Sequence, residues 1–188
     1  MATVLIGEDE TLIRLDIRTS LEDSGYDVGG EARDGLEAVE LARTLEPDVV
    51  ILDVKMPQLD GIEAARQILA ERPVPILLLT AYSNEKLVER AGEVGVFAYL
   101  VKPFRANELK PAIQTAIARH QEMLELRDEA DTLADALAAR KSIERAKGLL
   151  MKHEGLGEAE AFARLRTASQ KSRQPLKAIA DAIVAALD

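Results

Sequence analysis

Short apolar runs alternate with amphipathic stretches over the first half of the chain. Four runs rich in Val, Ile and Leu read VLIG at 4–7, VVIL at 49–52, ILLLTA at 76–81 and AYLV at 98–101, and a weaker one, YDVGGEA, spans 26–32. The segments between them carry apolar residues near the spacing of an amphipathic helix. Strands that alternate with helices of this length predict βαβ units and a parallel sheet covered on both faces. Five such units make a doubly wound α/β domain of about 120 residues, a common domain size.

The second half of the chain shows a purely helical pattern. From about 107 to 153 there is no strand signal, and apolar residues alternate at spacings of three and four. The seam that they form consists of Met123, Leu126, Ala130, Leu133 and Leu137. A heptad seam of this kind suits a coiled coil between two copies of the chain or an extended helical linker. A helix that lies on its own domain fits the same short pattern equally well.

Two more helices are predicted between Gly155 and the last residue. Phe162, Leu165 and Ser169 share one face of the first helix. The second helix gathers its apolar residues on one face, namely Leu176, Ile179, Ala180, Ile183 and Leu187. At the end of the long helical stretch, further apolar contacts come from Ile143, Leu150 and Met151. The three segments together predict a small three-helix bundle.

The change of pattern divides the chain into three parts. We predict an α/β domain at 1–120, a helical linker at 121–138 and the three-helix domain at 139–188. Net charge follows the same division, because 1–120 holds 13 basic and 21 acidic residues, whereas 140–177 holds 10 basic and 4 acidic residues. The resulting local charge of +6, in a chain whose total is -9, predicts a polyanionic partner for the C-terminal part alone.

Composition excludes several classes of protein. A chain of 188 residues that is 47% hydrophobic and 30% charged is globular rather than disordered. The absence of cysteine excludes a disulfide scaffold, thiolate metal sites and thiol catalysis. The N-terminus lacks the basic region and cleavage site of a signal peptide, and no apolar run approaches the length of a transmembrane helix. A cytoplasmic location is therefore the default expectation.

Four of the predicted strands end in a charged or hydroxyl side chain. Glu8 and Asp9 follow the first strand, Asp53 the third, Thr80 the fourth and Lys102 the fifth. Because ligands of an open parallel sheet bind beyond the carboxyl ends of its strands, these groups should converge on one site. Hard carboxylate oxygens suit Mg²⁺ that is shared with a phosphate. The set predicts that Asp53 acts as a nucleophile that accepts a phosphoryl group, while Mg²⁺ and Lys102 screen the developing charge.

Four segments of the first part resemble the signature motifs of response-regulator receiver domains. They read GEDE, LDVKMPQLDG, LLTAYS and YLVKPF. The resemblance covers about 3–120 and implies a flavodoxin-like fold with strand order 2-1-3-4-5. It further implies that Asp53 is the phospho-acceptor of a sensor histidine kinase. The Mg²⁺ ligands implied with it are Glu8, Asp9, Asp53 and the backbone carbonyl of Lys55.

The same resemblance assigns three more roles. Thr80 and Tyr99 correspond to the pair that relays phosphorylation to the outer face. A cis bond before Pro103 would hold Lys102 over the site, and this bond type is uncommon elsewhere.

The C-terminal part resembles an ANTAR domain, the RNA-binding antitermination module. AKGLLM, GEAEAF and the RLR that follows carry the match, and Gly157 stands where a serine N-cap is expected, which predicts a slightly weaker helix start. The resemblance implies that phosphorylation controls the binding of hairpin leader transcripts and transcription antitermination. The whole chain most resembles actinobacterial response regulators with an ANTAR output.

Recognition of RNA is expected to rest on cations. Phe162 is the only aromatic residue after Phe104, and its spacing predicts a core position, which would leave no aromatic ring for base stacking. Arg and Lys would then contact phosphates or stack on unpaired loop bases. The candidates are Arg140, Lys141, Arg145, Lys147, Lys152, Arg164, Arg166, Lys171, Arg173 and Lys177.

Other functions are compatible with parts of this pattern. A DNA-binding or protein-interaction output is the alternative, although the C-terminal helices carry few of the Asn and Gln residues that read bases in the major groove. A phosphatase of the haloacid dehalogenase type would need an aspartate where Lys55 stands. We therefore expect no enzyme activity beyond self-phosphorylation and self-dephosphorylation. Two routes of activation stay open, namely dimerisation along the 123–137 seam and release of the C-terminal part from the acidic receiver.

Overall fold

The computed structural model describes residues 2–81, 85–96 and 98–187. Tyr82 and Ser83 of the LLTAYS motif lie outside these ranges. The chain divides into two compact units, 1–124 and 125–188, which are described separately below. Within the described ranges, no helix combines the length and the apolarity needed to cross a membrane.

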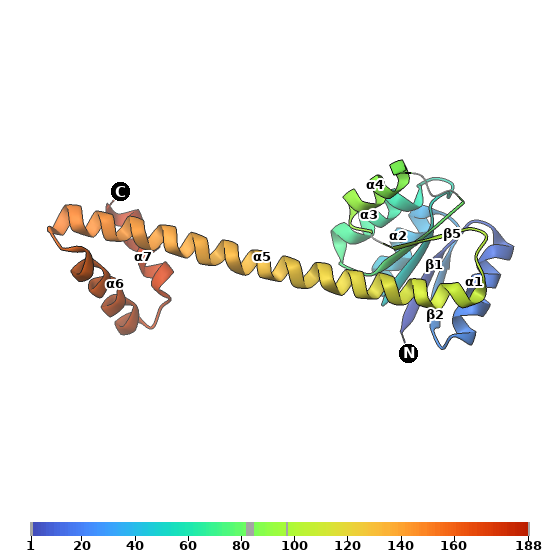
Figure 1. The fold of residues 1–188 in the computed structure, drawn as a ribbon, viewed down its shortest axis with the longest axis horizontal. Helices are drawn as coiled ribbons and strands as arrows, with labels where there is room; N and C mark the ends of the chain where they lie inside the picture. Colours follow the sequence, from blue (N-terminus) through green and yellow to red (C-terminus); the bar gives the residue numbers. More distant parts are fainter. Residues whose placement is uncertain (1, 82–84, 97, 188) are drawn as a thin grey trace. The chain divides into compact units, whose positions relative to one another are not determined.

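The first unit alternates strands with helices. The strands are β1 (Thr3–Gly7), β2 (Asp27–Ala32), β3 (Val49–Asp53), β4 (Ile76–Thr80) and β5 (Ala98–Val101). The helices are α1 (Thr11–Asp23), α2 (Gly35–Leu45), α3 (Gly61–Glu71), α4 (Glu85–Val94) and the first turns of α5 (Ala106–Glu154). The strands form one parallel sheet in the order β2-β1-β3-β4-β5 (Figure 1). This order confirms the predicted flavodoxin-like fold.

Two apolar layers hold the helices on the faces of the sheet. Alternate residues of a strand point to opposite faces. Leu52 and Leu78 pack with α2, α3 and α4, whereas Ile51 and Leu77 pack with α1 and α5. Every residue of β3 and β4 is buried, which explains why these strands read as continuous apolar runs instead of alternating ones. The side chains that end these strands therefore stand on a rigid support.

Helix α3 begins in direct contact with the end of β3. Asp60 caps the helix, because its carboxylate accepts a hydrogen bond from the Glu63 N–H at 2.9 Å. Gly61 follows, and a Cβ atom at this position would lie 2.0 Å from the carbonyl oxygen of Asp53. Only glycine permits this approach, so the LDG motif ends in glycine because α3 starts against the backbone of the strand-end aspartate.

Helix α5 belongs to both units. Its first turns place Leu109 and Ile113 on the sheet, and its last turns place Ala146 and Leu150 in the core of the second unit. The helical segment predicted at 121–138 is thus part of one 49-residue helix. The leucines of the predicted seam are exposed in this helix, with Leu133 at 64%.

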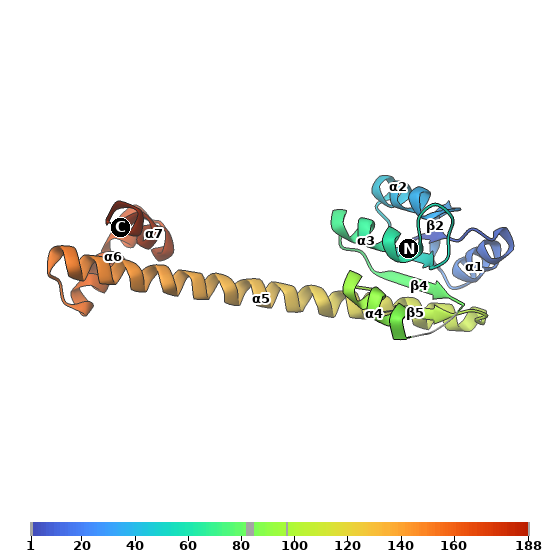
Figure 2. The same cartoon turned by 90° about the horizontal axis from the view of Figure 1, so that it is seen from above.

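The second unit consists of the end of α5, α6 (Glu158–Ser172) and α7 (Leu176–Leu187) (Figure 2). Its apolar core contains Leu150 and Leu165 together with Ala146, Ala161 and Ala180. At the start of α6, the Glu160 carboxylate accepts a hydrogen bond from the Gly157 N–H at 3.0 Å. Because glycine has no side chain that could accept in return, only half of a capping box is present.

Two side chains that the sequence assigned to this core lie outside it. Phe162 is 42% exposed and Met151 is 40% exposed, so both predictions were wrong. The core positions of α6 are taken by Ala161 and Leu165, which are fully buried. Alanine at the contact points of all three helices lets their backbones approach closely, which leaves no room for an aromatic ring. Phe162 follows Ala161 directly and is turned about 100° away from it around the helix axis.

Candidate functional site

The ends of β1, β3, β4 and β5 bring the predicted residues of the first unit together. Asp53 pairs with Leu79 at the end of β3, and Thr80 pairs with Val101 at the end of β4, so the strands end at one edge of the sheet. Carboxylate oxygens of Glu8, Asp9 and Asp53 all lie within 4.8 Å of one another. A cleft of about 480 Å³ lies beside them, and its walls include Asp9, Asp53, Lys55, Thr80 and Lys102.

The ammonium group of Lys102 bridges two of the three carboxylates. Its Nζ lies 2.5 Å from Oε2 of Glu8 and 3.1 Å from Oδ1 of Asp53. The Glu8 side chain is fully buried, and only 14% of the Lys102 side chain is exposed. A buried carboxylate without a partner would be strongly destabilising, so Lys102 keeps this cluster compatible with the fold. The peptide bond between Lys102 and Pro103 is cis, which confirms that expectation.

Burial controls the protonation of this cluster. Burial raises the pKa of Glu8 and of Asp53, and the hydrogen bonds and charge of Lys102 offset this effect only in part. Burial also acts to lower the pKa of Lys102, but its contacts with Glu8 and Asp53 outweigh burial and raise that pKa. Three carboxylates face one ammonium group, so negative charge is in excess. Such a set of hard oxygen donors fits a divalent cation such as Mg²⁺.

Arg14 is a part of the site that the sequence analysis missed. One guanidinium nitrogen, NH1, donates a hydrogen bond to the carbonyl oxygen of Glu8 at 2.6 Å, and Nε lies 3.2 Å from a carboxylate oxygen of Glu31 on β2. Arg14 thereby fixes the turn that carries Glu8 and Asp9. The sequence held a signal for this role, because Arg14 lies on the buried face of α1, where other residues are apolar.

The two residues predicted to relay phosphorylation differ in their surroundings. Thr80 is 3% exposed and lines the cleft beside Asp53. Tyr99 lies on β5, where it pairs with Leu78, and it is 43% exposed. Thr80 can therefore reach a group bound to Asp53, whereas the Tyr99 ring is available at the surface.

The ten candidate RNA-binding cations all lie in the second unit, and nine of them are exposed. Lys147 is the exception, because it is buried and its Nζ contacts carboxylate oxygens of Glu144 at 3.1 Å and Glu158 at 2.7 Å. It ties α5 to the first turn of α6. Arg164 also has a partner, Glu154, at 3.2 Å. The charges of these two cations are therefore already engaged by carboxylates of their own unit.

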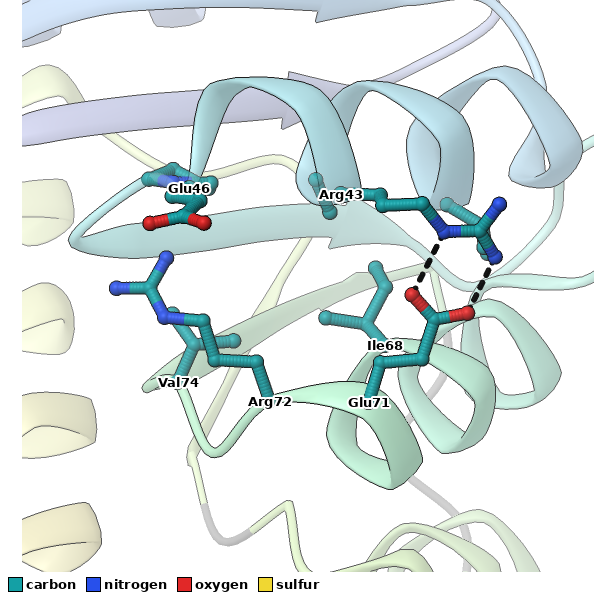
Figure 3. A pocket seen from close by; sticks show the side chains of 9 residues that line it. Arg43, Glu46, Ile68, Glu71, Arg72 and Val74 are labelled. Carbon is teal, nitrogen blue, oxygen red and sulfur yellow. Dashed lines mark hydrogen bonds and ion pairs between the residues drawn. The ribbon is translucent and has the colours of Figure 1, made fainter.

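Two other hollows lie away from this cleft. An open one of about 450 Å³ on α6 is lined in part by Arg164 and Lys171. The other, of about 240 Å³, lies between the C-terminal ends of α2 and α3, at the opposite edge of the sheet from the carboxylates. Figure 3 shows Arg43 paired there with Glu71, with Arg43 Nε 2.8 Å from Oε2 of Glu71. This second hollow contains none of the predicted site residues.

Comparison with known proteins gives the two units separate identities. The family model described as a response regulator receiver domain matches 4–114, and the model described as an ANTAR domain matches 131–184. The chain is 48% identical over 184 residues to the transcriptional regulatory protein PdtaR of Mycobacterium tuberculosis, a match that covers 98% of this chain and 90% of PdtaR. It is 36% identical over 117 residues to the chemotaxis protein CheY of Listeria monocytogenes, covering 62% of this chain and 98% of CheY.

The solved structures agree on the fold of the first unit. The signal receiver domain of a modulated diguanylate cyclase from Desulfovibrio desulfuricans superposes with a TM-score of 0.60 at 36% identity. That comparison covers 65% of this chain and 98% of the other. Matches to a receiver and to an ANTAR domain describe a regulatory arrangement rather than a catalytic one.

Proposed function

The chain belongs to the response-regulator family, with an N-terminal receiver domain and a C-terminal ANTAR domain, and we propose that phosphorylation of Asp53 by a sensor histidine kinase controls its binding to hairpin RNA. Through that binding it regulates transcription antitermination. The observation that carries the proposal is the cluster of Glu8, Asp9 and Asp53, whose carboxylate oxygens lie within 4.8 Å of one another beside Lys102 and next to an open cleft.

The residues of the cleft have complementary roles in phosphoryl transfer. A carboxylate oxygen of Asp53 attacks the phosphorus of a phosphohistidine, so that a P–O bond forms, the P–N bond breaks and its electron pair returns to the imidazole. Lys102 neutralises charge on the transferred group, and the Thr80 hydroxyl donates a hydrogen bond to it. Glu8, Asp9, Asp53 and the backbone carbonyl of Lys55 would hold Mg²⁺, which when bound would supply further neutralisation of the phosphoryl oxygens.

Phosphorylation is then relayed to the outer surface of the receiver. Thr80 makes a contact in the phosphorylated state that is absent before phosphorylation, and a differential contact of this kind is what shifts an equilibrium. Tyr99 is the second member of the relay. Its exposed position on β5 allows a change in the cleft to alter the surface that a partner meets.

The second unit binds RNA through its cations. A net charge of +6 over 140–177 supports this role, because phosphate contacts dominate nucleic-acid affinity. The match to an ANTAR domain supports RNA as the polyanion. PdtaR is a transcriptional regulatory protein by name, and we assign transcription as the regulated process in this chain as well.

We assign the receiver to 1–120, the linker to 121–138 and the RNA-binding domain to 139–188.

A second copy of the chain is the partner of the linker, because Leu126, Leu133 and Leu137 are 60%, 64% and 55% exposed along one heptad seam. Activation proceeds either by this dimerisation or by release of the basic domain from the acidic receiver. RNA binding measured at different salt concentrations distinguishes the two routes. Only release predicts an isolated 121–188 fragment that binds RNA more tightly than the unphosphorylated chain at low salt.

The test combines phosphorylation with binding of nucleic acid. Acetyl phosphate and Mg²⁺ should add one phosphoryl group to the full-length protein, seen by mass spectrometry, and Asp53→Asn should abolish the addition. Asp23→Asn, at an exposed site on α1, is the matched control. The phosphorylated protein should prefer a hairpin RNA to duplex DNA. Labelling of the Asn variant would refute the acceptor, and a preference for duplex DNA would favour a DNA-binding output.

A further inference from the structure

Phe162 is an exposed aromatic ring on an otherwise polar helix face. It is 42% exposed, and it lies outside the apolar core that Ala161 and Leu165 build with the other two helices. Burial of a phenylalanine side chain is strongly favourable, so a ring at the surface of so small a unit forgoes stabilisation that a core position would provide. The exposed ring is therefore accessible to a ligand.

Two polar residues follow Phe162 at intervals of one turn along α6. Arg166 lies four residues after Phe162, one turn further along the helix, and Gln170 lies one turn beyond that. Both side chains are exposed. No ion pair among the described residues involves Arg166, in contrast to Arg164, which is paired with Glu154. A flat apolar ring thus stands beside a planar guanidinium that is available to a ligand.

We propose that Phe162 and Arg166 form a stacking platform for one unpaired base of an RNA loop. This inference rests on the proposed RNA-binding function and names the part of the surface that holds a base rather than a phosphate. Unpaired loop bases are commonly held by stacking on aromatic rings or on guanidinium planes, with hydrogen bonds to their edges. Phe162 supplies the stack, and Arg166 and Gln170 supply groups that can reach the edge of the base.

The chemistry of this face favours a nucleobase over a second copy of the chain. A dimer interface needs a contiguous apolar surface with few charges at its centre. Phe162 instead stands singly beside an exposed cation, within the 140–177 segment whose net charge of +6 would repel the same segment of a second copy. An apolar surface suited to a second copy is already present on α5, in the seam that contains Leu126 and Leu133.

The platform divides the work of recognition between two kinds of residue. Stacking tolerates any base, because every base has a π face, so Phe162 contributes affinity with little sequence preference. A guanidinium group donates hydrogen bonds only to bases whose edges present suitable acceptors. Arg166 therefore contributes selectivity among bases. The remaining exposed cations bind phosphates. Loss of Phe162 should therefore weaken loop binding and leave the salt dependence of binding unchanged.

The experiment uses the full-length phosphorylated protein and a pool of hairpin RNAs that share one stem and carry randomised loops. The tightest binder is resynthesised with 2-aminopurine at each loop position in turn, because stacking quenches the fluorescence of this base. Binding of the wild-type protein should quench one loop position. Phe162→Leu keeps an apolar side chain but has no ring, so it should abolish that quenching and weaken binding roughly 5- to 150-fold. Phe162→Trp should preserve both the quenching and the binding affinity.

Control experiments distinguish the effect of the Phe162 ring from effects of folding, of apolar surface and of charge. Met151→Ala changes a side chain that is 40% exposed in the same unit but has no ring, and it should alter affinity less than twofold. Circular dichroism should show that Phe162→Leu is folded. With an abasic nucleotide at the quenched position, the wild type and Phe162→Leu should bind equally, because the two changes remove the same contact. Arg166→Lys keeps the charge and should lose discrimination between loop bases.

The outcomes distinguish this inference from the function on which it rests. If no hairpin of the pool binds the wild type, both the proposed function and the platform are wrong. If hairpins bind but Phe162→Leu retains full affinity and quenching, RNA binding stands and the platform is refuted. A shift of Phe162→Leu from dimer to monomer in sedimentation, with unchanged affinity per protomer, would refute it as well and assign the ring to an interface.

Discussion

The two units of this protein use charged residues in opposite ways. In the receiver, Glu8, Asp53 and Lys102 are largely withdrawn from water and lie in contact at a single point. In the second unit, nine of the ten candidate cations are exposed and are spread over three helices and the segment between α6 and α7. The first arrangement raises the pKa of Asp53 and of Glu8 through burial, whereas in the second Lys147 is buried but its partners Glu144 and Glu158 stay exposed.

This difference corresponds to two kinds of task. Chemistry on one atom needs fixed partners and little water, because electrostatic interactions are strong and oriented only in a protected site. Attraction of a polyanion needs many cations that keep their hydration and act together over a surface. In this protein the buried cluster and the exposed cations lie in two different compact units.

The largest effect should come from a change that unfolds only the second unit. Leu165 is fully buried in a small core, so Leu165→Ala should lower the free energy of unfolding of this unit by about 2–5 kcal/mol. A loss of this size is enough to unfold a unit so small. RNA binding should be lost, while labelling of Asp53 by acetyl phosphate continues. Denaturation followed by circular dichroism, with labelling in parallel, measures both. Leu36→Ala, at an exposed site on α2, is the control, and a joint loss of labelling in Leu165→Ala would show that the units are not independent.

The next effect should be confined to the receiver. Asp9→Asn removes one of three clustered carboxylates, so the affinity for Mg²⁺ should fall by at least the roughly 10- to 100-fold that loss of an outer-shell partner costs. Titration calorimetry with Mg²⁺ measures this change directly. Asp16→Asn, on the exposed face of α1, should bind Mg²⁺ as the wild type does. Equal affinity in both variants would remove Asp9 from the metal site.

A smaller effect should distinguish cations within the second unit. Lys171 is exposed, so Lys171→Ala should reduce the slope of log affinity against log salt by about 0.7, the value for one phosphate contact on single-stranded RNA. The choice among RNA loops should not change. Lys147 already neutralises Glu144 and Glu158, so Lys147→Met should leave the slope unaltered. Equal slope changes in the two variants would mean that burial does not decide which cations bind RNA.

The smallest effect should be on the stability of the receiver without Mg²⁺. Burial raises the pKa of Asp53 above its ordinary value of 3.8, so the ionised carboxylate destabilises the folded state at neutral pH. Asp53→Asn should therefore raise the melting temperature at neutral pH. The gain should vanish in acid, because protonation of Asp53 below its folded-state pKa removes the same charge from the wild type. A gain of equal size at both pH values would contradict this account.

The sequence by itself determined most of the receiver. The apolar runs located all five strands, most clearly β3 and β4, because strands buried on both faces must be continuously apolar. The residues at the strand ends identified the cleft, since the ends of parallel strands meet at one edge of the sheet. Glu8, Asp53 and Lys102 were therefore found without coordinates. Arg14 was missed, because a charge on a buried helix face has no partner that can be identified from local sequence.

Only the tertiary structure decided how the second unit presents its surface. Helical periodicity predicts that Phe162 and Leu165 share one face of α6, but it does not say which part of that face meets the other helices or how closely. The close approach of the helices at Ala146, Ala161 and Ala180 assigned the core to Leu165 and left Phe162 exposed. Packing of α6 against α5 likewise buries Lys147, which lies on α5 and contacts Glu158 of α6. The physical reason is that a small helical core is fixed by packing between segments distant in sequence, whereas the strand ends of a parallel sheet are aligned by its own hydrogen bonds.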